Sequence, residues 1–318
     1  MKKKTGFMLM LILLTATLAA GCGSTNKANS QGESELPMLT IGMMPATDVI
    51  PFIIAHDQGF DKKHGVNLDM QTFKSAKDRD AAFQAGQLDG VGADLIAIAI
   101  YNQGDMDVRI TSTTFGGFSL LTGTPGVKSV ADLKGKSVIY SKNTSTEYAV
   151  SLMLKEVGLT EKDITLTEVP QIPTRLELLK NNKADAAILP EPFVTMGKAD
   201  GLTELNSTLA MSLSPFVVGF PEKTIVANQE PIRAAYAAYD EAVAYMQSHD
   251  QADYIDLIIK AVGYPDTMKD QVTLPEYPAS HQVPVSEVEM AFNWAREKGL
   301  LEKNLTAEEV ISDVAFAK

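Results

Sequence analysis

The chain has 318 residues, of which 45% are hydrophobic and 21% are charged, as in ordinary globular proteins. Its formal net charge is −12, which argues against nucleic-acid binding, because that function needs clustered lysine and arginine. Cys22 is the only cysteine, so an intrachain disulfide is excluded and core packing must supply the stability.

The chain opens with a pattern typical of export. Residues 2–4 are three lysines, and residues 7–20 are almost uninterruptedly apolar. This run is shorter than the roughly 20 apolar residues that span a membrane, as expected of a secretory signal. Its end, Leu-Ala-Ala-Gly before Cys22, resembles the lipobox of bacterial lipoproteins, in which the cysteine becomes the lipid-carrying N-terminus. We therefore expect residues 1–22 to be a lipoprotein signal peptide; an ordinary signal peptide with an incidental cysteine is the alternative.

A flexible tether is expected next. Residues 23–37 are small and polar, which predicts a segment that holds a domain away from a membrane surface. Loss of the three N-terminal lysines changes the net charge from −12 to about −15, so attachment would depend on the lipid rather than on charge.

Strands and helices alternate through the following stretch, which predicts parallel βαβ units and an α/β fold. The predicted strands are 39–44, 66–73, 90–93, 108–114 and 118–122, and the predicted helices are 50–59, 76–87 and 95–101. The strand 66–73 alternates apolar and polar residues, as a half-buried strand does.

A second block of similar build follows. A strand is expected to end at Tyr140, and a helix to run from about 145 to 157 with Thr144 and Glu147 as a capping box. Residues 203–213 give no clear pattern, and 216–220 should be a strand that returns to the first block. The remaining predicted helices are 193–198, 230–249, 254–262, 287–298 with Ser286 and Glu289 as a capping box, and a short one opening at 306–309.

The two blocks match at an offset of 96 residues. Arg79 then falls on Arg175, Phe83 on Leu179, and Asp89 on Asp185. The match indicates two lobes of similar build, although any two βαβ units share such periodicity.

Motifs for catalysis, metal binding and phosphate binding are absent from the sequence. The four histidines are not at metal-ligand spacing, and neither HExxH, GxSxG nor GxxxxGK[ST] occurs. The run Gly90-Val91-Gly92 begins like a dinucleotide fingerprint, but Leu95 stands at the third glycine position. We therefore expect a binding protein without a cofactor or a metal.

Candidate ligand contacts lie at the carboxyl ends of predicted strands and at adjoining helix starts, where ligands collect in open α/β sheets. They are Thr47, Asp48, Asp94, Thr113, Thr114, Ser141, Asn143, Thr144, Ser145, Thr146 and Glu191. The segment 141–146 suits an oxyanion such as sulfonate, carboxylate or nitrate, with helix capping by Thr144 as the alternative. Asp48, Asp94 and Glu191 favour an amine or an amino-heterocycle instead, unless Asp94 caps a helix and Glu191 joins the lobes. No lysine or arginine is assigned to the pocket.

Four segments resemble the solute-binding proteins that serve ABC importers. They are PFIIAHDQGF at 51–60, DAAFQAGQLDG at 80–90, VADLKGK at 130–136 and NWAREKGL at 293–300. Together they identify residues 39–305 as similar to the nitrate/sulfonate/taurine and thiamine-precursor binding group.

The resemblance implies a two-lobed type II periplasmic-binding-protein fold. Each lobe would be a mixed, mostly parallel sheet flanked by helices, with two crossover segments between the lobes. Lobe 1 would comprise 38–123 and 214–318, and lobe 2 would comprise 124–213.

The implied function is capture of a small polar organic solute or oxyanion between hinged lobes. The closed form would deliver this solute to an ABC permease with its ATPase. We expect an extracytoplasmic monomer, anchored in the membrane by the lipid on Cys22. The alternative is an enzyme of the same fold related to pyrimidine-precursor synthesis, which an export signal disfavours.

Overall fold

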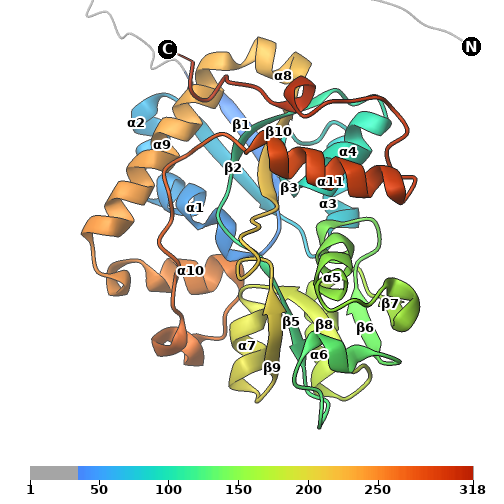
Figure 1. The fold of residues 1–318 in the computed structure, drawn as a ribbon. Coiled ribbons are helices and arrows are strands. Elements are labelled where there is room, and N and C mark those ends of the chain that lie inside the picture. Colours follow the sequence, from blue (N-terminus) through green and yellow to red (C-terminus); the bar gives the residue numbers. More distant parts are fainter. Residues whose placement is uncertain (1–34, 318) are drawn as a thin grey trace, which may run out of the picture. The chain divides into compact units, whose positions relative to one another are not determined.

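The computed structural model describes residues 35–317 of the chain. The predicted signal peptide, Cys22 and most of the predicted tether lie outside the described residues. From Leu36 onward the chain forms one compact unit with two five-stranded sheets (Figure 1). We call the part built around the first sheet lobe 1 and the part built around the second sheet lobe 2.

The first sheet has the strand order β2-β1-β3-β10-β4, and only β10 runs antiparallel to its neighbours. Its strands are β1 (Met38–Met43), β2 (Asn67–Thr72), β3 (Gly90–Asp94), β4 (Val108–Thr113) and β10 (Phe216–Pro221). β1 and β3 are buried along nearly their whole length, as central strands of a sheet covered on both faces must be, whereas the edge strand β2 is partly exposed.

The second sheet repeats this arrangement with the order β7-β6-β8-β5-β9, in which β5 is the antiparallel strand. Its strands are β5 (Phe118–Thr122), β6 (Ser137–Tyr140), β7 (Thr165–Glu168), β8 (Ala186–Pro190) and β9 (Thr203–Ser207). In each lobe the antiparallel strand follows a crossing from the other lobe. The two-lobed α/β fold with mixed, mostly parallel sheets is therefore as predicted.

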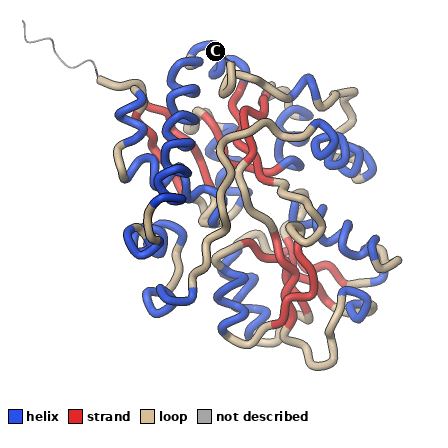
Figure 2. Tube along the Cα trace, turned by 60° about the vertical axis from the view of Figure 1, so that its left-hand side comes forward, coloured by secondary structure: helices blue, strands red, loops and turns tan. Residues whose placement is uncertain are grey.

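Helices cover both faces of both sheets (Figure 2). In lobe 1 they are α1 (Ile50–Asp57), α2 (Phe60–His64), α3 (Ala76–Gln84), α4 (Leu95–Gln103), α8 (Glu222–Ala227), α9 (Gln229–Ser248), α10 (Ile255–Val262) and α11 (Val285–Glu297). In lobe 2 they are α5 (Ser145–Glu156), α6 (Ile172–Lys180) and α7 (Phe193–Ala199). Short 3₁₀ turns, among them η1 (Thr47–Val49) and η3 (Glu161–Asp163), join several of these elements. No helix in the described part of the chain is both long and apolar enough to span a membrane.

The lobes are joined by two crossings, between β4 and β5 and between β9 and β10. Ser214 ties them together, because its hydroxyl donates to the carbonyl oxygens of Thr114 and Gly116 at 3.2 and 2.9 Å. The predicted lobe boundary after residue 123 is too late, since β5 already pairs within the second sheet. The other predicted boundary, after residue 213, lies inside the second crossing.

Some local expectations are corrected. β9 lies in the stretch 203–213, which gave no clear pattern, because its residues Thr-Glu-Leu-Asn-Ser form a largely polar edge strand. α11 begins after Pro284 without a side-chain cap, so Ser286 and Glu289 form no capping box. Thr144 does cap α5, but Glu147 accepts the amide of Asn143 at 2.7 Å rather than that of Thr144.

The 96-residue offset relates equivalent positions of the two lobes. Asp89 and Asp185 each accept, at 2.9 Å, an amide of the neighbouring strand, from Thr40 and Ser137 respectively. The backbone amide of each aspartate donates to the carbonyl oxygen of that same partner. The predicted correspondence therefore extends to individual hydrogen bonds.

Candidate ligand-binding site

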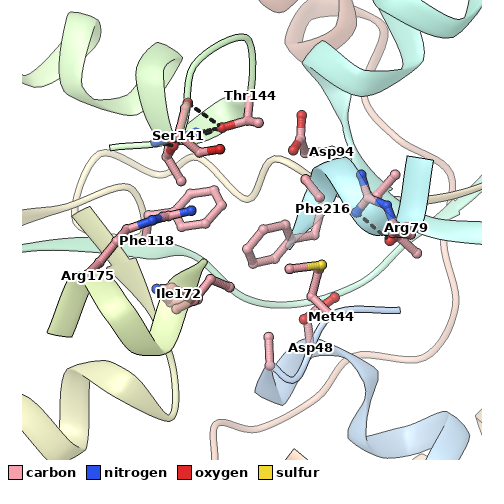
Figure 3. A pocket seen from close by; sticks show the side chains of 16 residues that line it. Met44, Asp48, Arg79, Asp94, Phe118, Ser141, Thr144, Ile172, Arg175 and Phe216 are labelled. Carbon is pink, nitrogen blue, oxygen red and sulfur yellow. Dashed lines mark hydrogen bonds between the residues drawn. The ribbon is translucent and has the colours of Figure 1, made fainter. Parts of the chain in front are cut away.

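A cleft lies between the two lobes at the carboxyl ends of β1, β3, β6 and β8 (Figure 3). Its empty volume is about 540 Å³, including the mouth that opens to solvent. Lobe 1 lines it with Met44, Ala46, Asp48, Ala76, Arg79, Gly92, Ala93, Asp94 and Phe216, and lobe 2 with Phe118, Ser141, Thr144, Thr146, Ile172, Arg175 and Pro190. Five of the predicted site residues thus meet here: Asp48, Asp94, Ser141, Thr144 and Thr146.

Two buried carboxylates stand on the lobe 1 side of the cleft. Asp48 follows β1 and accepts the hydroxyl of Thr114 at 2.9 Å, and burial raises the pKa of Asp48 to about 6 despite this bond. Asp94 ends β3, and its Oδ1 accepts the amides of Ile96 and Ala97 at 3.0 Å each. Asp94 is therefore the N-cap of α4, as the structural alternative predicted, while also lining the cleft.

Asp94 also connects the lobes, because its Oδ1 accepts the hydroxyl of Ser145 in α5 at 2.8 Å. Burial raises the pKa of Asp94, whereas the charge of Arg79 and the donors of Ala97 and Ser145 lower it.

Arg79 is one of two buried arginines that line the cleft, neither of which sequence reasoning assigned to it. It lies on α3, is only 2% exposed, and donates from Nη1 to the carbonyl of Gly92 at 3.0 Å. Asp80 neutralises its charge, with Oδ1 2.8 Å from Nη2 and 2.9 Å from Nε. Burial lowers the pKa of Arg79, but Tyr101, Asp80 and Asp94 outweigh this effect, so its pKa lies above the ordinary value.

Arg175 is the second buried arginine, on α6 of lobe 2, and it is 3% exposed. Its guanidinium donates only to backbone carbonyls, those of Val169 at 2.7 Å, Pro170 at 3.0 Å and Ile188 at 3.3 Å. Burial lowers the pKa of Arg175 to about 10, so it is still protonated at neutral pH. No carboxylate of residues 35–317 forms an ion pair with it. A buried and unpaired charge of this kind is costly unless an anion joins it.

The loop 141–146 uses two of its four hydroxyls internally. The hydroxyls of Thr144 and Thr146 donate to the carbonyl of Ser141 at 2.9 and 3.1 Å, and Thr146 accepts the amide of Ser141. These bonds fix the turn that starts α5, so capping accounts for both threonines. The side chain of Ser141 lines the cleft (Figure 3).

Apolar side chains close the cleft between its charged sides. The rings of Phe118 and Phe216 meet edge to face, with centroids 4.8 Å apart, and each ring follows one crossing. Met44 and Ile172 add apolar surface from opposite lobes (Figure 3). The cleft therefore joins an apolar wall to a few polar groups, as small-molecule sites do.

The other predicted site residues do not line this cleft. Thr113 contacts the His281 ring, with Oγ1 3.0 Å from Nε2, and Thr114 positions Asp48. Asn143 is exposed, and Ser145 is buried against Asp94.

Thr47 and Glu191 border a separate cavity beside the crossings. Glu191 accepts the amide and hydroxyl of Thr195 at 3.0 Å each, within its own lobe, so the structure does not use it to join the lobes. Within residues 35–317 no group of three or more His, Cys, Asp or Glu is placed to hold a metal.

The lobes also touch beside the cleft, where α5 meets α4 and α11. The amine of Lys298, at the end of α11, lies 2.7 Å from Glu147 and 2.6 Å from Glu161. Tyr148 of α5 is fully buried among lobe 1 core residues, with its ring 5.4 Å from that of Trp294. We call these contacts, together with the bond between Ser145 and Asp94, the α5 latch.

A match to a family model shows which protein family the chain belongs to. The model described as the NMT1-like family matches residues 32–260, more than half of the chain. The chain belongs to the NMT1-like family. A Brachyspira hyodysenteriae protein named as an ABC transporter periplasmic binding protein is 22% identical to this NMT1-like chain over 232 residues. That match covers 67% of the chain and 66% of the relative, just under two thirds of the relative's length.

Solved structures share the fold of this NMT1-like protein at low sequence identity. The aliphatic sulphonate binding protein SsuA of Escherichia coli has a TM-score of 0.74 at 19% identity, covering 87% of this chain and 98% of its own. The nitrate-binding protein NrtA of Synechocystis PCC 6803 has a TM-score of 0.74 at 16% identity, covering 89% and 88%. The desulfurization enzyme DSZB has a TM-score of 0.65 at 13% identity, covering 87% and 96%. The periplasmic-binding-protein fold expected from the sequence is thereby confirmed.

Proposed function

We propose that this NMT1-like protein is the extracytoplasmic solute-binding subunit of an ABC importer. It captures a small polar organic solute between its lobes and delivers it to a permease that a separate ATPase drives. The observation that carries the proposal is Arg175, a buried guanidinium without a carboxylate partner in the described residues, placed where the two lobes meet. The relative named as an ABC transporter periplasmic binding protein supports the same function.

The bound solute carries an anionic group in this proposal. A guanidinium offers five N–H donors, and three hydrogen bonds to backbone carbonyls leave donors for a carboxylate, sulfonate or similar oxyanion. The hydroxyl of Ser141 adds a donor from the same lobe. Phe118 and Phe216 provide apolar surface for the rest of the molecule.

The proposed mechanism is closure of the lobes on the solute. A solute that contacts both sides of the cleft binds the closed form more tightly than the open form, so it shifts the population toward closure. The closed form is then the one that docks on the permease. The protein acts as a monomer, held at the outer face of the membrane by a lipid on Cys22.

Purification of the protein from its host with its endogenous solute tests the proposed function. We expect native mass spectrometry to show a one-to-one complex of a monomer with one small molecule, released unchanged on denaturation. The apo protein should melt at a higher temperature with that molecule, because binding stabilises the folded state. Absence of any bound solute, together with no thermal shift across sulfonates, aminopyrimidines, nitrate and aromatic acids, would contradict the proposal.

Catalysis related to pyrimidine-precursor synthesis has less support. No histidine, cysteine or lysine of residues 35–317 lines the cleft, and Asp94, Thr144 and Thr146 hold the starts of α4 and α5 through their hydrogen bonds. Chemical conversion of the co-purified solute during incubation with the protein would favour the enzyme instead.

A further inference from the structure

The two buried arginines occupy equivalent places in the two lobes, at the offset of 96 residues. Arg79 Nη1 donates to the carbonyl of Gly92 and Arg175 Nη1 donates to that of Ile188, in each case 13 residues further along the chain. Both carbonyls belong to the equivalent strands β3 and β8. The two lobes therefore present a guanidinium to the cleft in the same way.

The residue after each arginine decides whether its charge is available. In lobe 1 this residue is Asp80, which neutralises Arg79 through two contacts of 2.8 and 2.9 Å. In lobe 2 it is Leu176, an apolar core residue that offers no charge. Lobe 1 shows that the fold accommodates a neutralised arginine at this position. In lobe 2, by contrast, no carboxylate of residues 35–317 pairs with the equivalent Arg175.

The carboxylates of the cleft have the opposite distribution. Asp48 and Asp94 both belong to lobe 1, and lobe 2 places no acidic residue among those that line the cleft. Asp94 uses Oδ1 for its three hydrogen bonds, and no donor among residues 35–317 bonds to its Oδ2. Figure 3 shows Asp48 and Asp94 on one side of the cleft and Arg175 on the other. The cleft is therefore polarised, with its negative side on lobe 1 and its positive side on lobe 2.

We propose that the solute carries both charges and lies in one orientation, with its protonated amine against Asp48 and Asp94 and its anionic group against Arg175. This inference rests on the proposed function and adds the charge pattern and the direction of the ligand. Each end of such a solute compensates charges that are otherwise buried, so a compound with one charge leaves the other side uncompensated. A bipolar solute also joins the two lobes directly, which couples its recognition to closure.

Titration calorimetry with matched sets of probes tests this inference. The first set is taurine, ethanesulfonate and ethylamine, the second is β-alanine, propanoate and ethylamine, and the third is γ-aminobutyrate, butanoate and propylamine. At least one zwitterion should bind about tenfold or more tightly than both of its singly charged counterparts. Equal or tighter binding of the anion without its amine would overturn the inference, as would failure of every zwitterion to bind at millimolar concentration.

Isosteric variants then test the orientation. Asp94→Asn keeps the helix cap, because asparagine caps helices as well as aspartate does. It should weaken zwitterion binding about tenfold while leaving binding of the matched anion within about threefold. Arg175→Gln should weaken both the zwitterion and the anion about tenfold or more. Asp185→Asn, away from the cleft, is the matched control and should change neither affinity.

Asp80→Asn gives a reciprocal test, because it removes the partner of Arg79 without changing Arg175. It should raise the affinity for the matched anion several-fold, since a second guanidinium becomes available. Zwitterion binding that depends on Arg175 but is unaffected by Asp94→Asn and Asp48→Asn would overturn the bipolar assignment and leave the proposed function standing. An endogenous solute that binds elsewhere would instead contradict the proposed function.

Discussion

The charge of Asp48 depends on its burial. Thr114 donates to its Oδ2 and Arg79 lies nearby, yet burial dominates and raises its pKa to about 6. Tyr239 and Tyr277 are the other ionisable groups close to it, and burial raises the pKa of both, so they stay neutral below pH 8. Asp48 is therefore a group of the cleft that titrates close to neutrality, and burial also raises the pKa of Asp94 on the same side.

This titration predicts a pH dependence of binding. Protonation of Asp48 below about pH 6 removes the carboxylate that an amine-bearing solute contacts. The affinity should therefore decrease as the pH is lowered, by at most about tenfold per pH unit for one proton. Calorimetry with the best zwitterionic probe, from about pH 7 to about pH 5, measures it. Asp48→Asn should remove the step near pH 6, and the matched anion should not show the loss. An affinity that rises as the pH falls would contradict this assignment.

Tyr148 gives a second prediction at this scale. Its hydroxyl is buried and has no hydrogen-bond partner in the described structure. Tyr148→Phe removes an unsatisfied group, so the free energy of unfolding should stay the same or rise by up to about 1 kcal/mol. Urea unfolding measures this change.

Tyr236→Phe is the matched control for that substitution. The Tyr236 hydroxyl is also buried but lies 2.6 Å from Thr111 Oγ1, so its loss should destabilise the fold by about 1 kcal/mol. Equal destabilisation by the two variants would show that Tyr148 has a partner after all.

At the scale of elements, the α5 latch holds the lobes together beside the cleft. Lys298 approaches Glu147, which is almost fully buried, and Glu161, so a single lysine of lobe 1 compensates two carboxylates of lobe 2. Opening of the lobes would break these pairs and expose Tyr148 and Trp294 to water. The latch therefore favours the closed form even before a solute binds.

Lys298→Met should shift the protein toward the open form. The radius of gyration of the apo protein, measured by small-angle X-ray scattering, should increase, and solute affinity should fall about fivefold, or roughly 1 kcal/mol. Lys269→Met is the control, because its partner Asp256 lies 2.6 Å away in the same lobe. An unchanged radius and affinity in the Lys298 variant would show that the latch does not contribute to closure.

Most elements could be predicted from periodicity, and the return of 216–220 to the first sheet is confirmed, whereas the sheet to which 118–122 belongs was not predicted. The apolar run 118–122 identifies a strand, yet only the crossing of the chain decides that β5 pairs in the second sheet. β9 is hidden because an edge strand with polar side chains lacks the alternation that marks a half-buried strand. The boundaries between the lobes depend on which strands pair with each other in the folded protein. The predicted boundary after residue 123 was therefore misplaced, because β5 pairs with β8 and β9.

The site was predictable where residues follow strands and hidden where they lie within helices. Asp94 ends β3, Ser141 follows β6, and Asp48 lies in the turn beyond β1, so the strand ends located them. Arg175 lies among Ile172, Leu176 and Leu179 on α6, where an arginine ordinarily extends toward solvent. The one signal for it was the 96-residue offset, which paired it with Arg79.

At the scale of the whole molecule, the predicted lipid anchor separates attachment from binding. Cys22 precedes the described residues, and the cleft is built from Met44 onward. Cys22→Ser should therefore release the protein from the membrane fraction of its host and leave solute affinity unchanged. Immunoblotting of fractionated cells and calorimetry measure the two effects. Unchanged membrane association of the variant would remove the lipoprotein assignment.

The course of the chain through the crossings makes lobe 2 a continuous insert between β4 and β10. A chimaera that receives residues 118–207 from another family member would therefore exchange the whole anion-facing half through only two splice points, and keep the amine-facing half intact. The solute preference of such a protein can therefore be changed one lobe at a time.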